Sequence, residues 1–448
     1  MELVNYVQEL EHFSKTEILD KLGNDNDLLK KLRLHNIIKK NKQGKYNFHF
    51  VGVIMMDKFV LNVYPKYIPK KNNIKDEFKQ IIKVINKYNK THEDFDNQND
   101  DLEDISIYIL SLMIFFIEDY YENGIYHNAK NIIETNGNGE INWDRTINYN
   151  YPIIKNNTPY YVELQTNYRK DNLFDYFRLL HEFVITKCSK KLNEAGLLQM
   201  LNLIPVELSY MIQEDFGDIN HILNKLIMEL NVEYNTHKRK LLKSMHAFFS
   251  QMNSLSNEKT LTVYGVTDYE YIWEEVCSKV FENKLDVKLS DLDLKFEKDC
   301  TLREYINEPI WYIDGEEINK DKLRPDLITI KEDKFLIFDA KYYQFTLENG
   351  KLYNQPGLQS ITKQYLYELA YKELIEDFKV KNAFLFPTSE DKFLNRGFVK
   401  LDIWYNLKLE KIDVIMVPAK KIYKYYLENE TLDICDEFKN HQTHKTDY

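Results

Sequence analysis

The chain has 448 residues, of which 44% are hydrophobic and 14% aromatic. This length exceeds one ordinary core and the apolar content is ample for burial, so we expect two or three folded domains and exclude a disordered chain. The net charge of −11 argues against a protein that coats DNA unaided, because nonspecific DNA affinity comes largely from Lys and Arg. A local basic surface remains compatible with this charge.

The cysteines and the apolar segments point to a cytoplasmic protein. The four cysteines are widely scattered and show neither a Cys-x-x-Cys pair nor zinc spacing, so we expect reduced thiols. The N-terminus lacks a basic segment followed by an apolar one, and therefore shows no secretory signal. The longest apolar stretch, residues 105–117, is too short for a membrane span and predicts a buried helix.

Residues 1–75 predict a small α+β module. Helical patterns cover Lys15–Leu22 and Asp27–Ile38, and the β-rich runs Tyr46–Met56 and Phe59–Tyr64 meet at Asp57-Lys58. The stretch 30–45 is rich in lysine. Such a module is compatible with a winged helix that touches DNA, with a docking module for another protein, and with a solvated helix face.

Residues 76–256 predict a mostly helical middle domain. A polar, acidic interruption at Glu93–Asp104 indicates a loop, and the glycines of the insert Thr135–Ile147 predict a tight turn between helical segments. No Gly-Lys-Ser or Gly-Lys-Thr follows these glycines, so the chain encodes no nucleotide-hydrolysing motor of this type.

Residues 257–448 predict a domain that alternates helices and strands. A helix is expected over Asp268–Phe281, followed by two strands around residues 327–330 and 335–338. A second helix over Gln359–Phe378 and strands at Ala383–Phe386 and Asp413–Val417 complete it. The unbroken apolar run Phe335–Phe338 is typical of a strand covered on both faces.

The two central strands carry a pattern that favours metal chemistry. Asp339 and Lys341 are two residues apart and therefore point the same way, while Ala340 points into the opposite layer. Pairing of the two strands would bring Asp326 beside Asp339. Two such close carboxylates repel each other unless a hard cation such as Mg²⁺ or Mn²⁺ lies between them, and Lys341 would then stabilise the charge on a phosphate.

This pattern resembles the PD-(D/E)XK nuclease superfamily, through Pro325-Asp326 and Asp339-Ala340-Lys341. The alternative is a turn followed by a salt-bridged strand. Members of the superfamily commonly supply a third acid from the preceding helix, for which we favour Glu274 after Trp273 over its neighbour Glu275. Gln364 resembles a glutamine that lies near the metal or the DNA in a subset of these nucleases, although the usual Gln-x-x-x-Tyr spacing is absent and an exposed helix amide is the alternative.

Over residues 50–343 the order of motifs resembles the LlaJI family of restriction endonucleases, which are similar to McrC. The resemblance is carried by Phe50–Tyr67, by the insert 137–147, by Tyr264-Gly265 before Trp273-Glu274, and by the core from Pro325 to Lys341. It implies an α+β multidomain fold with a C-terminal α/β PD-(D/E)XK nuclease core and mixed sheet at 257–448. Metal ligands would be Glu274, Asp326, Asp339 and the Ala340 carbonyl, with Lys341 as the catalytic cation.

The resemblance further implies a type II or type IV-like restriction endonuclease, acting with a separate McrB-like AAA+ GTPase in anti-phage defence. The cofactor would be Mg²⁺, with Mn²⁺ as a substitute, and GTP would act only through the partner. The substrate would be double-stranded DNA, and cleavage of both strands favours self-association. Two alternatives stay open: a stand-alone endonuclease that recognises DNA through residues 1–75, and a non-catalytic adaptor that activates the GTPase.

Overall fold

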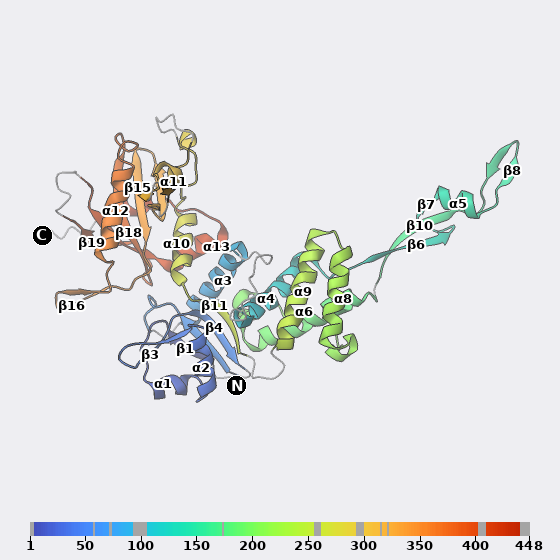
Figure 1. Ribbon diagram of the computed structural model, residues 1–448, viewed down its shortest axis with the longest axis horizontal. Coiled ribbons are helices and arrows are strands. Elements are labelled where there is room, and N and C mark those ends of the chain that lie inside the picture. Colours follow the sequence, from blue (N-terminus) through green and yellow to red (C-terminus); the bar gives the residue numbers. More distant parts are fainter. Residues whose placement is uncertain are drawn as a thin grey trace. The chain divides into compact units, whose positions relative to one another are not determined.

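The computed structural model describes residues 4–56, 59–70, 74–92, 105–172, 174–254, 261–292, 300–313, 316–319, 322–401 and 409–439. Two compact units are present (Figure 1): unit 1 combines residues 1–93 with 263–448, and unit 2 spans residues 94–262. The boundaries at residues 75 and 256 stay a prediction, since the compact units follow another division. The expected acidic loop and the junction at Asp57-Lys58 lie outside the described residues.

Unit 1 begins with a four-stranded sheet in the order β1-β5-β4-β11. Strand β5 pairs in parallel with β1 and antiparallel with β4. Gly52 and Gly265 allow the backbones of β4 and β11 to approach closely, because a Cβ at Gly52 would lie 2.1 Å from the Tyr264 carbonyl oxygen. The strands are β1 (Val4–Gln8), β4 (Val51–Met56), β5 (Phe59–Tyr64) and β11 (Leu261–Val266).

Along the chain, two helices and a hairpin lie between β1 and β4. Helix α1 (Lys15–Lys21) agrees with the prediction, whereas α2 (Asn26–Leu34) ends earlier than expected because Asn36 adopts a left-handed conformation with φ of 57°. Residues at the expected helix end instead form β2 (Ile38–Lys40), which pairs antiparallel with β3 (Tyr46–Phe48). The predicted single run Tyr46–Met56 is therefore two strands, β3 and β4.

The second sheet of unit 1 has five strands in the order β14-β15-β18-β20-β19. It is mixed, because β15, β18 and β20 run parallel while the two edge strands are antiparallel to their neighbours. Residues 335–340 of β15 are buried on both faces, as the apolar run predicts. The strands are β14 (Leu327–Lys331), β15 (Lys334–Ala340), β18 (Lys379–Thr388), β19 (Leu394–Val399) and β20 (Ile412–Pro418).

Helices cover this sheet in the expected order of helix, two strands, helix and strand. Helix α12 (Leu358–Ala370) is shorter than predicted, and the chain continues to Phe378 in tight turns such as the one closed by Leu374 N–H and the Tyr371 carbonyl. Tyr367 of α12 and Tyr371, which caps its C-terminus, pack against Phe335 and Ile337 of β15. The remaining helices are α3 (Ile74–His92), α10 (Tyr269–Val280), α11 (Leu302–Tyr305), α13 (Ala419–Glu428) and α14 (Ile434–Lys439).

Unit 2 has a helical core. Phe116 on α4 makes an edge-to-face contact with Phe248 on α9 and lies beside His181 on α6. The predicted buried helix is α4 (Ile105–Asn123), which extends six residues beyond the expected Ile117. No helix among the described residues is long and apolar enough to cross a membrane. The other helices are α6 (Tyr176–Glu194), α7 (Leu197–Leu201), α8 (Ile219–Val232) and α9 (Thr236–Ser254).

A β-rich arm projects from this helical core (Figure 1). The prediction that the insert Thr135–Ile147 joins helical segments is wrong: the insert begins at the last residue of β6 (Ala129–Thr135), whose antiparallel partner is β10 (Gln165–Asp171). The physical reason is close backbone approach, since a Cβ at Gly139 would lie 2.0 Å from the Asn167 carbonyl oxygen. The outer arm contains β7 (Glu140–Ile141), α5 (Trp143–Tyr149), β8 (Ile153–Lys155) and β9 (Thr158–Tyr160).

Candidate active site

Asp326 and Asp339 lie side by side at the ends of β14 and β15. The antiparallel register pairs Leu327 with Phe338, and its continuation by one residue places the two aspartates opposite each other. Their carboxyl groups share a hydrogen bond, and Asp326 Oδ2 also accepts one from the Ala340 N–H at 2.8 Å. Burial and the neighbouring Asp339 raise the pKa of Asp326 well above its usual range. The expected juxtaposition of these two carboxyl groups is present.

Lys341 completes the group on β15. Its Nζ lies 2.9 Å from both carboxylate oxygens of Asp339, as expected for residues two apart on a strand. Burial alone would lower the pKa of Lys341, but Asp339 and Asp326 outweigh it and raise the pKa above its ordinary value. The Lys341 N–H donates to the Leu385 carbonyl at 2.9 Å, so this residue still belongs to the sheet. The ammonium is therefore charged and held at the sheet edge.

Helix α10 presents two adjacent glutamates to different surroundings. Trp273 is fully buried and donates from Nε1 to the Leu385 carbonyl at 3.1 Å. The Lys341 N–H donates to the same carbonyl, so this contact fixes helix α10 beside Lys341. Burial raises the pKa of Glu274 to about 7, with Lys341 opposing the shift and Asp339 adding to it. Glu275 instead accepts a hydrogen bond from Tyr426 and lies 3.1 Å from His92. These contacts favour Glu274 as the third acid.

The donor set fits a hard cation in its chemistry. The raised pKa values of Asp326 and Glu274 reflect carboxyl groups that are crowded and partly desolvated, and a divalent cation among their oxygens would relieve this repulsion. Within the described part of the chain, however, no three His, Cys, Asp or Glu side chains are grouped closely enough to hold one metal ion. The aspartate pair is formed, and the contribution of Glu274 as a ligand stays a prediction.

The two remaining predicted site residues have defined places in the structure. Ala340 is buried, and its role as a carbonyl ligand stays a prediction. Gln364 on α12 is fully buried, so the alternative of an exposed amide is wrong. Its Nε2 donates to the Ile337 carbonyl at 3.1 Å, which ties the helix to the strand that carries Asp339.

A buried contact that the sequence did not reveal involves Tyr342, the residue that follows Lys341. The hydroxyl of Tyr342 donates to the carboxylate of Glu9, which follows β1, and the ammonium of Lys66 lies 4.0 Å from the Tyr342 ring centre. Burial raises the pKa of Glu9, while Lys66 opposes the shift. No local pattern could have revealed the pair, because 333 residues separate Glu9 from Tyr342.

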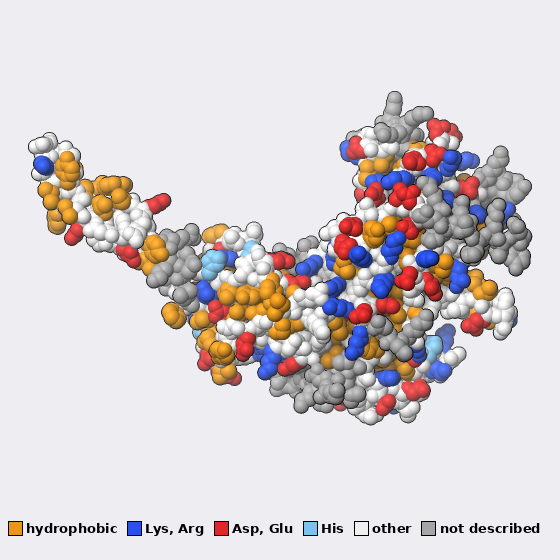
Figure 2. All heavy atoms as spheres, turned by 180° about the vertical axis from the view of Figure 1, so that it is seen from behind, with side chains coloured by type: hydrophobic (Ala, Val, Ile, Leu, Met, Phe, Trp, Pro, Cys, Tyr) orange, Lys and Arg blue, Asp and Glu red, His pale blue; other side chains and the backbone are white. Residues whose placement is uncertain are grey.

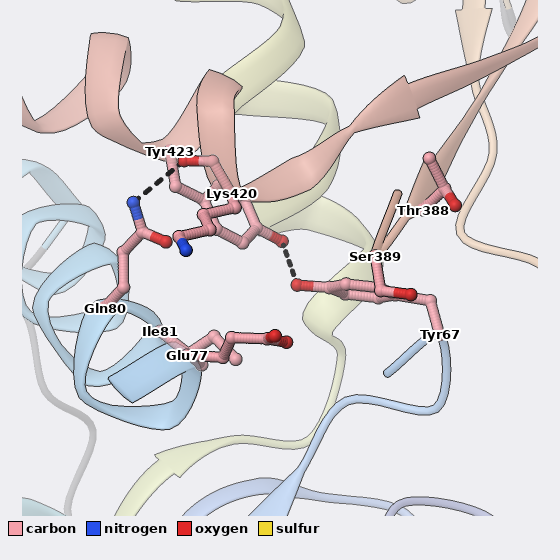
Figure 3. A pocket seen from close by; sticks show the side chains of 8 residues that line it. All are labelled: Tyr67, Glu77, Gln80, Ile81, Thr388, Ser389, Lys420 and Tyr423. Atoms are coloured by element: carbon pink, nitrogen blue, oxygen red, sulfur yellow. Dashed lines mark hydrogen bonds between the residues drawn. The ribbon is translucent and has the colours of Figure 1, made fainter. Parts of the chain in front are cut away.

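A small pocket next to this cluster joins the first and last segments of unit 1 (Figure 3). Tyr67 donates to the hydroxyl of Tyr423 at 3.4 Å, and the Gln80 side chain donates to the Lys420 carbonyl at 2.9 Å. None of the predicted site residues lines this pocket. Its contacts hold α3 and the loop after β5 against α13.

The chain thus combines a mixed α+β fold with paired carboxyl groups at one edge of a sheet. The sequence model of the LlaJI restriction endonuclease family matches residues 50–420. The chain therefore belongs to the LlaJI restriction endonuclease family.

Two further comparisons describe similar proteins. The type II restriction enzyme BsuMI component YdjA of Bacillus subtilis (strain 168) is 28% identical over 451 residues, covering 96% of this chain and 91% of that protein. A refined half-complex of Thermococcus gammatolerans McrB AAA+ hexamers with bound McrC contains a chain of 12% identity with a TM-score of 0.41, covering 95% of this chain and 99% of that one. A cryo-EM structure of the Thermococcus gammatolerans McrBC complex contains a chain of 11% identity with a TM-score of 0.26, covering 61% and 86%.

Proposed function

We propose that the chain is the Mg²⁺-dependent DNA endonuclease subunit of a bacterial restriction system directed against phage DNA. The proposal rests on the pair of Asp326 and Asp339 at the sheet edge, with the Lys341 ammonium 2.9 Å from Asp339. A turn followed by a salt-bridged strand accounts for the lysine contact alone. It does not account for two hydrogen-bonded carboxyl groups held together at the end of a buried sheet.

Each residue has a defined task in this proposal. Asp326 and Asp339 hold the cation, with Glu274 as the third acid. A bound Mg²⁺ supplies Lewis-acid stabilisation at the scissile phosphate and a more acidic water. Lys341 places positive charge beside the phosphate, where negative charge develops as its bond to the leaving oxygen breaks. Trp273 and Gln364 fix the helices that flank this edge and take no part in the chemistry.

The test is cleavage of duplex DNA in Mg²⁺ by the full chain, with and without a McrB-like GTPase and GTP. Lys341→Ala and Asp326→Ala should abolish cleavage, whereas Lys334→Ala, at the far end of the same strand, should leave it intact. Cleavage at the wild-type rate by either site variant would refute the assignment. Cleavage without the GTPase would support a stand-alone enzyme, and GTPase stimulation without any cleavage would support an adaptor.

We further propose that the arm of unit 2 contacts the AAA+ GTPase. The outer arm exposes a series of large hydrophobic side chains (Figure 2), and a contiguous apolar surface of this kind is typical of a protein contact. Tyr151 is 97% exposed and Val162 67% exposed. The other exposed members include Trp143, Ile147, Tyr149, Ile153, Ile154 and Tyr160.

The partner proposal is tested by substitutions on the arm that leave unit 1 unchanged. Ile153→Ser combined with Ile154→Ser should weaken binding to the GTPase and its stimulated GTP turnover. The matched control is Leu347→Ser, which removes an exposed hydrophobic side chain from unit 1. If the arm variant binds the GTPase as tightly as the wild type, the arm is not the docking element.

A further inference from the structure

Residues 13–48 of unit 1 form a helix-turn-helix followed by a hairpin. Helix α1 ends at Lys21, and a four-residue turn through Gly23 leads to Asp25, whose side chain caps α2 by accepting from the N–H groups of Asp27 and Leu28. The hairpin of β2 and β3 follows directly, and Tyr46 also bridges to Phe13 ahead of α1. This is the element order of a winged helix, with α2 in the place of the recognition helix and β2–β3 as the wing.

The exposed side of this module is basic. Between residues 28 and 48 the chain has seven Lys and Arg and no Asp or Glu, although the whole chain carries a net charge of −11. Helix α2 buries Leu28, Leu29 and Leu32, and the opposite face exposes Asn26, Lys30 and Arg33 at helical spacing. Lys30 forms an exposed ion pair with Asp27 at 3.1 Å, a contact too weak to remove the local positive charge.

The helix and the wing bring their cations to the same place. Arg33 of α2 and Lys40 of β2 lie 6.0 Å and 5.6 Å from the ring centre of Tyr46. The wing loop is held in shape by Asn41, whose side chain accepts from the N–H groups of Gln43 and Lys45. A solvated helix face would account for the positive charge on α2 alone, and it does not account for the positive charge on the hairpin beside it.

We propose that this module binds the phosphate backbone of double-stranded DNA, with α2 in the major groove and the wing on the adjacent backbone. Positive charge on both elements complements the duplex, and Asn and Arg at the exposed face of α2 are suited to base edges. The inference rests on the proposed action on DNA and adds a second contact to it. The module is tied to the nuclease strand, because Leu10 N–H donates to the Phe48 carbonyl and the neighbouring Glu9 accepts from Tyr342.

The experiment measures binding separately from cleavage. A fluorescein-labelled 40-base-pair duplex is titrated with the full chain in EDTA at several KCl concentrations, and anisotropy gives the affinity and its salt dependence. The test variant combines Lys30→Gln, Arg33→Gln, Lys42→Gln and Lys45→Gln. The matched control removes four other exposed lysines, through the substitutions Lys190→Gln, Lys351→Gln, Lys372→Gln and Lys392→Gln.

The test variant should bind roughly tenfold or more weakly near 100 mM KCl, and the slope of log K against log salt should fall by about 3–4. Two double variants, Lys30→Gln with Arg33→Gln on α2 and Lys42→Gln with Lys45→Gln in the wing, should each lose part of that slope. They test the proposal if the fourfold variant fails to fold. Unchanged affinity and slope overturn the proposal, as does an equal loss in the control.

Two other results have defined meanings. Unchanged DNA binding with lost GTPase binding would show a protein-docking module and overturn the inference. The titration in EDTA measures binding without cleavage, so a failure of the proposed cleavage leaves the result on the module readable.

Discussion

The two adjacent glutamates of α10 should respond in opposite ways to the same substitution. Glu274→Gln should stabilise the metal-free protein at pH 8, whereas Glu275→Gln should leave its stability unchanged or lower it slightly. The reason is that burial, with Asp339 nearby, raises the pKa of Glu274 to about 7, so its ionised form is unfavourable in the folded protein. Glu275 has favourable contacts with Tyr426 and His92 that the amide weakens.

The magnitude follows from the pKa of Glu274 and its ordinary value of 4.5. That difference corresponds to roughly 3 kcal/mol, and because Glu274 is only partly buried, solvent screening reduces the expected gain to about 1–2 kcal/mol. The folded state binds the proton more tightly than the unfolded state. Stability from this group is therefore full below pH 4.5, is lost as the pH rises towards 7, and is absent at pH 8.

The assay is urea unfolding of both variants and the wild type in EDTA, at pH 5 and pH 8. The gain from Glu274→Gln should be present at pH 8 and shrink at pH 5, and the same variant should lose DNA cleavage while Glu275→Gln keeps it. Equal and destabilising effects of the two substitutions at pH 8 would show that Glu274 is an ordinary structural glutamate, and the third acid would have to be sought elsewhere.

Three further predictions concern positions outside the acidic group. Gly52→Ala should lower the free energy of unfolding by more than about 3 kcal/mol, because its Cβ would lie 2.1 Å from a backbone oxygen. Gly23→Ala should lower it by only about 1 kcal/mol, because Gly23 has a φ of 67° but open space around it. Thermal unfolding of both variants measures the difference. Tyr342→Phe removes one of the two donors to the buried carboxyl of Glu9 and leaves the Lys66 N–H, so it should cost about 1–3 kcal/mol and lower the cleavage rate. An unchanged cleavage rate would show that this contact does not affect Lys341. Burial lowers the pKa of His181 to about 4, so stability should fall by about 3 kcal/mol as the pH drops from 6.5 to 4, and unfolding of His181→Asn should show a flatter pH profile.

The strand that carries the candidate site could be predicted because its information is local. The apolar run 335–338 specifies a strand buried on both faces, and the alternation of side chains then places Asp339 and Lys341 together. The partner carboxylate also follows, since a hairpin-length spacer makes Asp326 the residue opposite Asp339. Period and spacing along the chain are sufficient for these positions.

Other features depend on contacts that no local pattern records. The arm was missed because its two long strands lack a regular alternation of apolar and polar residues, and their pairing joins residues 129–135 to 165–171 across a long insertion. The end of α2 was missed because a single left-handed residue, Asn36, outweighs the continuing apolar pattern. The burial of Gln364 depends on the sheet that α12 covers, which helical spacing alone does not reveal.

The contact between Glu9 and Tyr342 links the N-terminal module to the strand that carries the proposed site. Tyr342 follows Lys341 directly, and its hydroxyl is held by a carboxylate at the end of β1. The chain around Glu9 is in turn fixed to the wing strand, because Leu10 N–H donates to the Phe48 carbonyl at 2.9 Å. Removal of the first 50 residues would therefore expose a buried tyrosine beside the proposed catalytic lysine. A truncated protein that lost cleavage would not distinguish lost DNA docking from a disturbed lysine, whereas the surface substitutions on α2 and the wing do, because they leave Glu9 and Tyr342 in place.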